Sequence, residues 1–169
     1  LQKQVSLILV EISEMINKPG RDNNIKHNIS ILSNLIDSST KAAYFNINNN
    51  LLSDTKYFLD HMEIIKSQRN ILNTLYDLVS QLNYLPAQGQ IVSIFINMVG
   101  NTSFVVNTVN DLLNDLEKMY NDMKTQPLPQ DRDEFENRAI LFLCLIEMKK
   151  YLINRKKAQF LRDNYYYND

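Results

Sequence analysis

The sequence has few of the residues that interrupt regular structure. It contains 3 glycines and 4 prolines in 169 residues, too few for the many turns of a β-sandwich or barrel. Its single cysteine, Cys144, excludes an internal disulfide and is typical of a reducing compartment. The longest wholly apolar run, 139–146, is far shorter than the ~20 residues of a membrane-spanning helix. No signal peptide is recognisable.

The chain also lacks a strong excess of either charge. It has 18 basic and 19 acidic residues and a formal net charge of -1, so no global field would recruit nucleic acid. It contains no glycine-rich phosphate or dinucleotide motif and no serine nucleophile elbow. We therefore expect no enzyme activity, no catalytic residue, no cofactor and no nucleic-acid partner.

Helical periodicity of the apolar residues is the strongest pattern that is present. It predicts helices over 2–16, 25–45, 53–84, 90–99, from 101 or 102 to about 123, and 132–163. Ser53 or Asp54 would cap the third helix, and Gly100 would end the fourth in a left-handed conformation. The last helix is apolar on all sides at its centre, which is typical of a buried helix.

These helices predict one all-α domain over residues 1–169. The expected architecture is an antiparallel bundle of about five to six helices with a long central C-terminal helix. The apolar residues of the first predicted helix form one stripe that would face the core. The second predicted helix has a row of apolar residues that includes Leu35. The stripe of the first helix consists of Val5, Ile8, Leu9, Ile12 and Ile16.

A proline-rich linker precedes the last predicted helix. Pro127 and Pro129 cannot continue a helix, because each lacks an amide hydrogen and has a fixed φ. Asp131 is the predicted N-cap, with Glu134 at the reciprocal position of a capping box. The acidic residues of this first turn complement the helix dipole, so we interpret them as a charged helix start and not as a metal site.

The same segment carries a resemblance to a known family. It contains Pro127-Leu128-Pro129, Arg132-Asp133-Glu134-Phe135-Glu136, Arg138-Ala139 and Leu141-Phe142. Upstream lie a helix break, Gly100-Asn101-Thr102, and part of a long-helix motif, Glu63, Gln68, Ile71 and Leu72. These motifs resemble the putative aromatic acid exporter C-terminal domain family of bacterial membrane proteins. Ile65 departs from the pattern, where the family has a basic residue.

The resemblance implies a non-catalytic C-terminal domain with a role in assembly or regulation. Its main partner would be an N-terminal transmembrane region of the same polypeptide, at the cytoplasmic face of the bacterial plasma membrane. A homo-oligomer and an anionic lipid surface are further partners to consider. The chain begins with Leu1 instead of methionine, so we expect a fragment of a longer protein. The alternatives are a bundle that senses a small aromatic acid, or a stand-alone helical adaptor.

Three polar residues are candidates for a ligand site or an internal ion pair. Gln68 and Arg69 interrupt the apolar face of the third helix, and Arg138 lies at the start of the last one. An arginine can grip a carboxylate at two points, but structural ion pairs place arginines in the same way, and we favour the ion pair. His27 and His61 lack partners for a metal site; we expect His27 to be solvated and His61 to border the core, with Cys144 buried.

The end of the last helix is basic. It carries Lys149, Lys150, Arg155, Lys156, Lys157 and Arg162. These residues would either contact anionic lipid head groups or complement the carboxyl end of the helix, and the sequence favours neither. The final Tyr165-Tyr166-Tyr167 is interpreted as a frayed tail.

Overall fold

The computed structural model describes the backbone of residues 1–20, 24–46, 52–102 and 106–167. It describes their side chains too, except at 46, 52–55, 106, 107, 166 and 167. This part of the chain forms six helices and no strand: α1 (Gln2–Asn17), α2 (Ile25–Asn46), α3 (Leu52–Val79), α4 (Ala87–Asn101), α5 (Val106–Thr125) and α6 (Arg132–Tyr167). The predicted all-α fold is confirmed.

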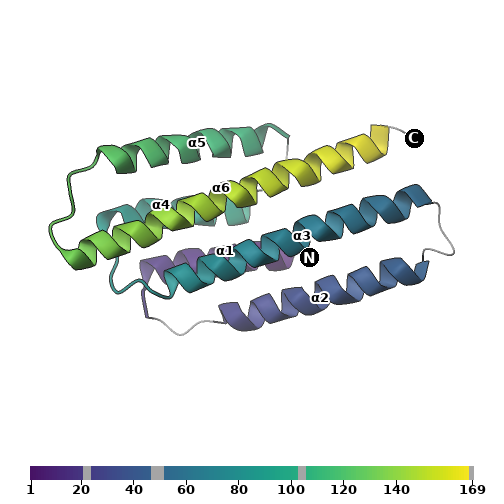
Figure 1. Ribbon diagram of the computed structural model, residues 1–169, viewed down its shortest axis with the longest axis horizontal. Coiled ribbons are helices and arrows are strands. Elements are labelled where there is room, and N and C mark those ends of the chain that lie inside the picture. The colour runs from purple at the N-terminus through teal and green to yellow at the C-terminus, as the bar shows by residue number, and fades with distance from the viewer. Residues whose placement is uncertain (21–23, 47–51, 103–105, 168–169) are drawn as a thin grey trace.

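The helices form two layers of unequal length. Successive helices alternate in direction, and α2, α3, α6 and α5 lie side by side in front of α1 and α4 (Figure 1). The front helices α3 and α6 have 28 and 36 residues, whereas α1 and α4 have 16 and 15. At about 1.5 Å per residue, the back layer therefore ends well before α3 and α6 do.

The core follows the predicted apolar stripes closely in α1. Val5, Ile8, Leu9, Ile12 and Ile16 are all fully buried, because α1 packs against α2, α3 and α4. Helical spacing places them on one face, where their burial is the main contribution to stability.

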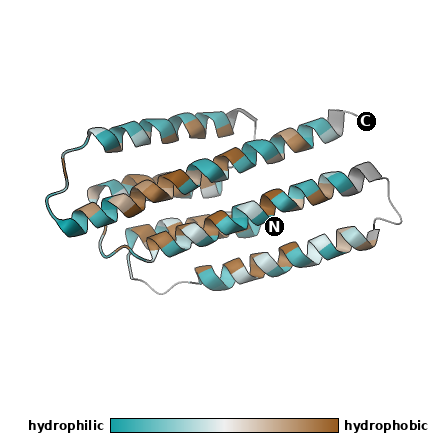
Figure 2. Cartoon of the chain, in the orientation of Figure 1, coloured by the Kyte–Doolittle hydropathy of each residue, from teal (hydrophilic) through white to brown (hydrophobic). Residues whose placement is uncertain are grey.

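One prediction about an apolar face is wrong. The last helix is not buried on all sides, since Leu143 and Ile153 are 44% and 40% exposed. Its apolar residues are concentrated in the half that follows the acidic start (Figure 2), and the helix packs against α3, α4 and α5 without being covered on every side. Leu35 of α2 is 40% exposed, because the row that contains it is wider than the contact with α3 and α1.

Gly100 was predicted to end α4 in a left-handed conformation, and this prediction is wrong. It lies within the helix, and Gly20 has the only positive φ among the described residues. A Cβ atom at Gly100 would lie 3.2 Å from the Cβ of Leu9 and 3.3 Å from the backbone oxygen of Ser6. Glycine is therefore needed at this position for the close approach of α4 to α1.

Other helix ends differ from the prediction by a few residues. α3 ends at Val79 instead of 84, and α4 begins at Ala87 instead of 90. Asn101 belongs to α4 and Thr102 follows it, so neither starts α5. The side chains of Ser53 and Asp54 lie outside the described residues, and their predicted capping role stays a prediction.

Candidate functional site

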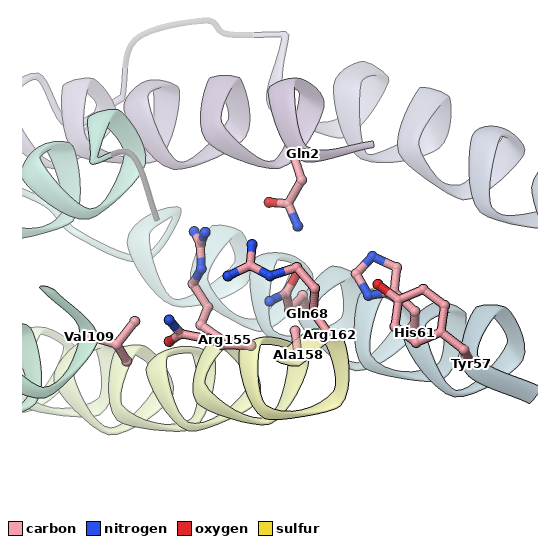
Figure 3. Close-up of a pocket in the computed structure, with 9 residues that line it drawn as sticks. Gln2, Tyr57, His61, Gln68, Val109, Arg155, Ala158 and Arg162 are labelled. Atoms are coloured by element: carbon pink, nitrogen blue, oxygen red, sulfur yellow. The ribbon is translucent and has the colours of Figure 1, made fainter. Parts of the chain in front are cut away.

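A cavity of about 220 Å³ that combines polar and apolar side chains lies between α3 and α6, where the back layer ends at the start of α1. It is lined by three residues of α3, four of α6, Gln2 of α1 and Val109 of α5 (Figure 3). The cavity exists because α3 and α6 continue past α1 and α4. Polar residues there are enclosed by helices together with the apolar side chains of Val109 and Ala158.

The helical register of α6 brings its four lining residues to one face. Arg155, Ala158, Gln159 and Arg162 are spaced at positions i, i+3, i+4 and i+7, which lie above one another on a helix. In Figure 3 the side chains of Arg155 and Arg162 both reach from α6 into the space beside Gln2. Ala158 lies between the two arginines, and its small side chain leaves the cavity open.

On the opposite wall, α3 contributes a polar amide that has no partner. Gln68 is 1% exposed, and neither its Nε2 nor its Oε1 forms a hydrogen bond. Within the described part of the chain, His61 Nδ1 and Gln159 Nε2 are also buried without a partner. Unpaired buried polar groups cost free energy, so a site with several of them calls for water or a ligand.

The cavity is positively charged. Arg155 is 6% exposed, and its Nη1 donates a hydrogen bond of 3.0 Å to Tyr151 Oη. Burial lowers the pKa of Arg155 and raises the pKa of Tyr151. Arg162 is nearer the surface, with its Nε 3.6 Å from Asp163 Oδ1. Among the described residues that line the cavity, none is acidic.

Aromatic rings close one end of the cavity. Tyr57 stacks on His61 with ring centroids 6.1 Å apart, and on Tyr165 with centroids 4.3 Å apart. Burial lowers the pKa of His61. The stacking also corrects the expectation of a frayed tail, because Tyr165 is part of α6 and packs on α3; the side chains of Tyr166 and Tyr167 lie outside the described residues.

The predicted ligand or ion-pair residues lie in different parts of the structure. Gln68 lines the cavity, and Arg69 does not, although its Nε is buried without a partner. Arg138 lies at the corner between α5 and α6, where it forms an ion pair with Glu134 and donates a hydrogen bond of 2.7 Å to the backbone oxygen of Pro127. Arg138 thus forms an ion pair in the structure, and its role as a ligand-binding or packing residue stays a prediction.

The corner also contains the predicted capping interactions. The backbone amide of Glu134 donates to Asp131 Oδ1 at 2.8 Å, as expected for an N-cap. Glu134 Oε2 accepts from the backbone amide of Gln130 at 2.8 Å, one residue before the position that a capping box predicts. The motif that carries the family resemblance thus builds the turn into α6.

The predicted basic patch divides into three parts. Lys149 and Lys150 are ion-paired with Glu117 and Glu147, at 3.3 and 2.6 Å. Arg155 is inside the bundle instead of on a membrane surface, because the register of α6 turns it toward α3. Lys156 and Lys157 are exposed, and they border an apolar groove with Phe160, which is 70% exposed.

The remaining candidate residues, His27 and Cys144, take part in none of the sites described above. His27 is exposed and Cys144 is fully buried. Burial, with a smaller contribution from Glu147, raises the pKa of Cys144 to about 12. No group of histidine, cysteine and acidic side chains that could hold a metal occurs in the described ranges.

Several cavity residues were missed by the sequence analysis. Tyr57, Ala158, Gln159 and Gln2 were not singled out, and Arg162 was assigned to a basic surface. The sequence feature that could have identified them is a mainly polar stripe at heptad spacing on α6, together with a similar stripe on α3. The same spacing also describes an ordinary solvent-exposed face, so periodicity alone does not separate the two.

Comparison with known proteins agrees with the resemblance. The model of the family described as putative aromatic acid exporter C-terminal domain matches residues 1–156. The uncharacterized protein YqjA of Bacillus subtilis (strain 168) is 29% identical over 119 residues; the match covers 70% of this chain and 37% of that protein's length. A crystal structure of a putative membrane protein from Clostridium difficile 630 has a TM-score of 0.91 and 53% identity, over 94% of this chain and 92% of that one. Over the described residues, no helix has both the length and the hydropathy to cross a membrane.

Proposed function

Because the chain belongs to the putative aromatic acid exporter C-terminal domain family, we propose that it is a non-catalytic regulatory domain of an integral membrane protein. The N-terminal transmembrane region of the same polypeptide would be its main partner, and it would lie at the cytoplasmic face of the plasma membrane. The family match over residues 1–156 carries this proposal. The matched relative is also much longer than this chain, with 37% of its length covered.

The structure supports regulation more than it supports chemistry. The family is named for an exporter and not for an enzyme. The cavity offers positive charge and amide groups that suit binding, and its histidine is held toward the neutral form by burial, which lowers its pKa. A domain of this kind would change the activity or assembly of the transporter in response to a bound molecule.

Alkaline carbonate extraction of host membranes tests the attachment to a membrane region. An antibody against this domain should detect a membrane-retained polypeptide much heavier than 19.8 kDa. In spheroplasts, external protease should leave the epitope intact until the cells are lysed. An antigen of about 19.8 kDa that is released by carbonate would overturn the proposal.

A second role, contact with anionic lipid, is favoured by the exposed end of α6. Lys156 and Lys157 line the same groove as Phe160, and within the described residues neither lysine forms an ion pair. Basic residues attract anionic head groups, and an exposed aromatic ring can enter the interface.

Sedimentation with vesicles that contain phosphatidylglycerol tests this contact. The K156E/K157E variant should lose binding, whereas K118E/K124E, which makes the same charge change on α5, should keep it. Equal binding by both variants would exclude the end of α6 as a lipid-binding surface.

A further inference from the structure

We propose that the cavity between α3 and α6 binds a small aromatic carboxylate, with the carboxylate beside Arg155 and Arg162 and the ring toward Tyr57 and His61. This inference deepens the proposed function by naming the class of ligand that would regulate the domain. Its physiological meaning rests on that function, but the binding itself can be measured on this chain alone.

The charge of the cavity selects an anion. Arg155 and Arg162 reach into it from the same face of α6, and no acidic residue is among the described lining residues. The planar guanidinium group of arginine pairs with a carboxylate through two parallel hydrogen bonds. Arg162 is the more accessible of the two, with 44% of its side chain exposed, so it can meet an entering ligand first.

The unpaired amides call for a ligand with hydrogen-bonding atoms. Gln68 has a free donor and a free acceptor in a position that is 99% shielded from solvent, and Gln159 Nε2 is another buried donor without a partner. A carboxylate oxygen would accept from the two amide nitrogens, and a ring hydroxyl would donate to Gln68 Oε1. The cavity of about 220 Å³ is far larger than the roughly 30 Å³ that one water occupies, so it has room for a small organic ligand.

Aromatic side chains at one end of the cavity favour a ligand that carries a ring. The stacked rings of Tyr57 and His61 form one end, and the small side chains of Val109 and Ala158 form apolar sides. Aromatic rings prefer offset-stacked or edge-to-face contact with other rings. A saturated ring of the same charge would lose that contact while keeping the arginine interactions.

Isothermal titration calorimetry on the 169-residue chain tests the inference with benzoate as the probe. Benzoate should bind saturably at one site per chain, and salicylate, which adds a ring hydroxyl, should bind at least as tightly. Cyclohexanecarboxylate should bind more weakly, and inorganic phosphate weaker still. Tighter binding of phosphate than of benzoate, or no saturable binding of benzoate, would overturn the proposal.

Matched variants locate the site. R162Q should weaken benzoate binding by about tenfold, since a lost charge-assisted hydrogen bond is of that size. K156Q removes one positive charge from the same helix but lies outside the cavity, and it should leave binding unchanged. A158L should fill the cavity and remove binding without lowering Tm. Equal effects of R162Q and K156Q would show attraction by the general charge of α6 and would overturn the site.

Gln68 gives a readout that a purely structural role would not give. Gln68→Met keeps the size of the side chain but removes the unpaired amide, so it should raise Tm in the absence of ligand while weakening benzoate binding by about tenfold or more. A lower Tm with unchanged benzoate affinity would show that Gln68 only supports the fold, through water or a rearranged partner, and would contradict the proposal.

The two proposals can fail separately. Benzoate binding by this chain, together with an antigen that is released from membranes at the size of the chain, would leave the ligand site standing and overturn the membrane attachment. A membrane-retained antigen without benzoate binding would overturn the ligand site and leave the membrane attachment standing.

Discussion

The side-chain oxygen of Asn137 in α6 accepts a hydrogen bond of 3.0 Å from the backbone amide of Asn83, in the turn between α3 and α4. The amide nitrogen of the same side chain donates to the backbone oxygen of Asp133 at 2.8 Å. Asn137 is fully buried. One side chain therefore ties the first turns of α6 to the turn that follows α3.

Replacing Asn137 by alanine should lower the free energy of unfolding by about 1 kcal/mol, because it removes the acceptor of a partly buried hydrogen bond from the Asn83 amide. Urea denaturation followed by circular dichroism would measure the change. Asn121→Ala, at an exposed position of α5, is the control and should shift stability by less than about 0.5 kcal/mol. Equal effects of the two substitutions would show that the Asn83 contact contributes little.

Arg138 should matter for stability and not for ligand binding. Arg138→Ala removes the ion pair with Glu134 and the bond to Pro127, and should cost about 1–3 kcal/mol of unfolding free energy. Arg138→Lys should also be destabilising, because a single ammonium group does not reproduce the planar fork that meets both partners.

The benzoate affinity of both Arg138 variants should match that of the unmodified chain, since Arg138 lies outside the cavity. Calorimetry under conditions where the variants are fully folded measures it. A large loss of affinity in a folded Arg138→Lys variant would place the ligand at the corner between α5 and α6.

Stability should decrease with acidification through His61. Burial lowers its pKa in the folded state below the usual 6.5, so the unfolded chain takes up a proton first as pH falls. The unfolded state then binds more protons, and stability is lost as pH falls from 6.5 through the lower pKa of the folded state. At higher pH both states are neutral at this residue and it contributes no pH dependence.

Urea unfolding at about pH 7.5 and about pH 5.5 would measure this effect. His61→Gln should reduce the difference in stability between the two pH values. His27→Gln, at an exposed position, should leave it unchanged. An unaltered pH dependence in His61→Gln would mean that carboxyl groups account for all of it.

Cys144 should report unfolding. Its side chain is fully buried and its pKa is raised to about 12, so almost no thiolate is present or accessible in the folded state. Ellman's reagent at about pH 8 should react with it slowly in buffer and rapidly in urea. Rapid labelling of the folded chain would show that the middle of α6 opens locally without global unfolding.

Much of the fold could be predicted from local pattern. The stripe of α1 is buried as its spacing requires, and Asp131 caps α6 because the interaction joins residues three apart in the chain. The errors concern contacts between helices. Gly100 was predicted to be a helix end, but it lies where α4 packs closely on α1, and nothing in its local sequence indicates which helix it contacts.

The candidate site was predicted only in part for the same reason. Gln68 was identified because an amide interrupts an apolar stripe, and it lines the cavity. Arg155 and Arg162 were assigned to a surface, because a basic run near a helix end has the same composition whether it faces solvent or another helix. Burial of Arg155 at 6% exposure is a property of the register between α6 and α3.

By itself, the sequence determined six amphipathic helices, the corner at Pro127–Pro129 and the absence of residues for disulfides or common catalytic motifs. These follow from periodicity, capping and backbone restriction, which act within a few residues. Only the tertiary structure decided that α3 and α6 extend beyond α1 and α4, so that Gln68, Arg155 and Arg162 line one cavity. That outcome depends on the relative lengths and positions of helices far apart in the chain, which no local interaction encodes.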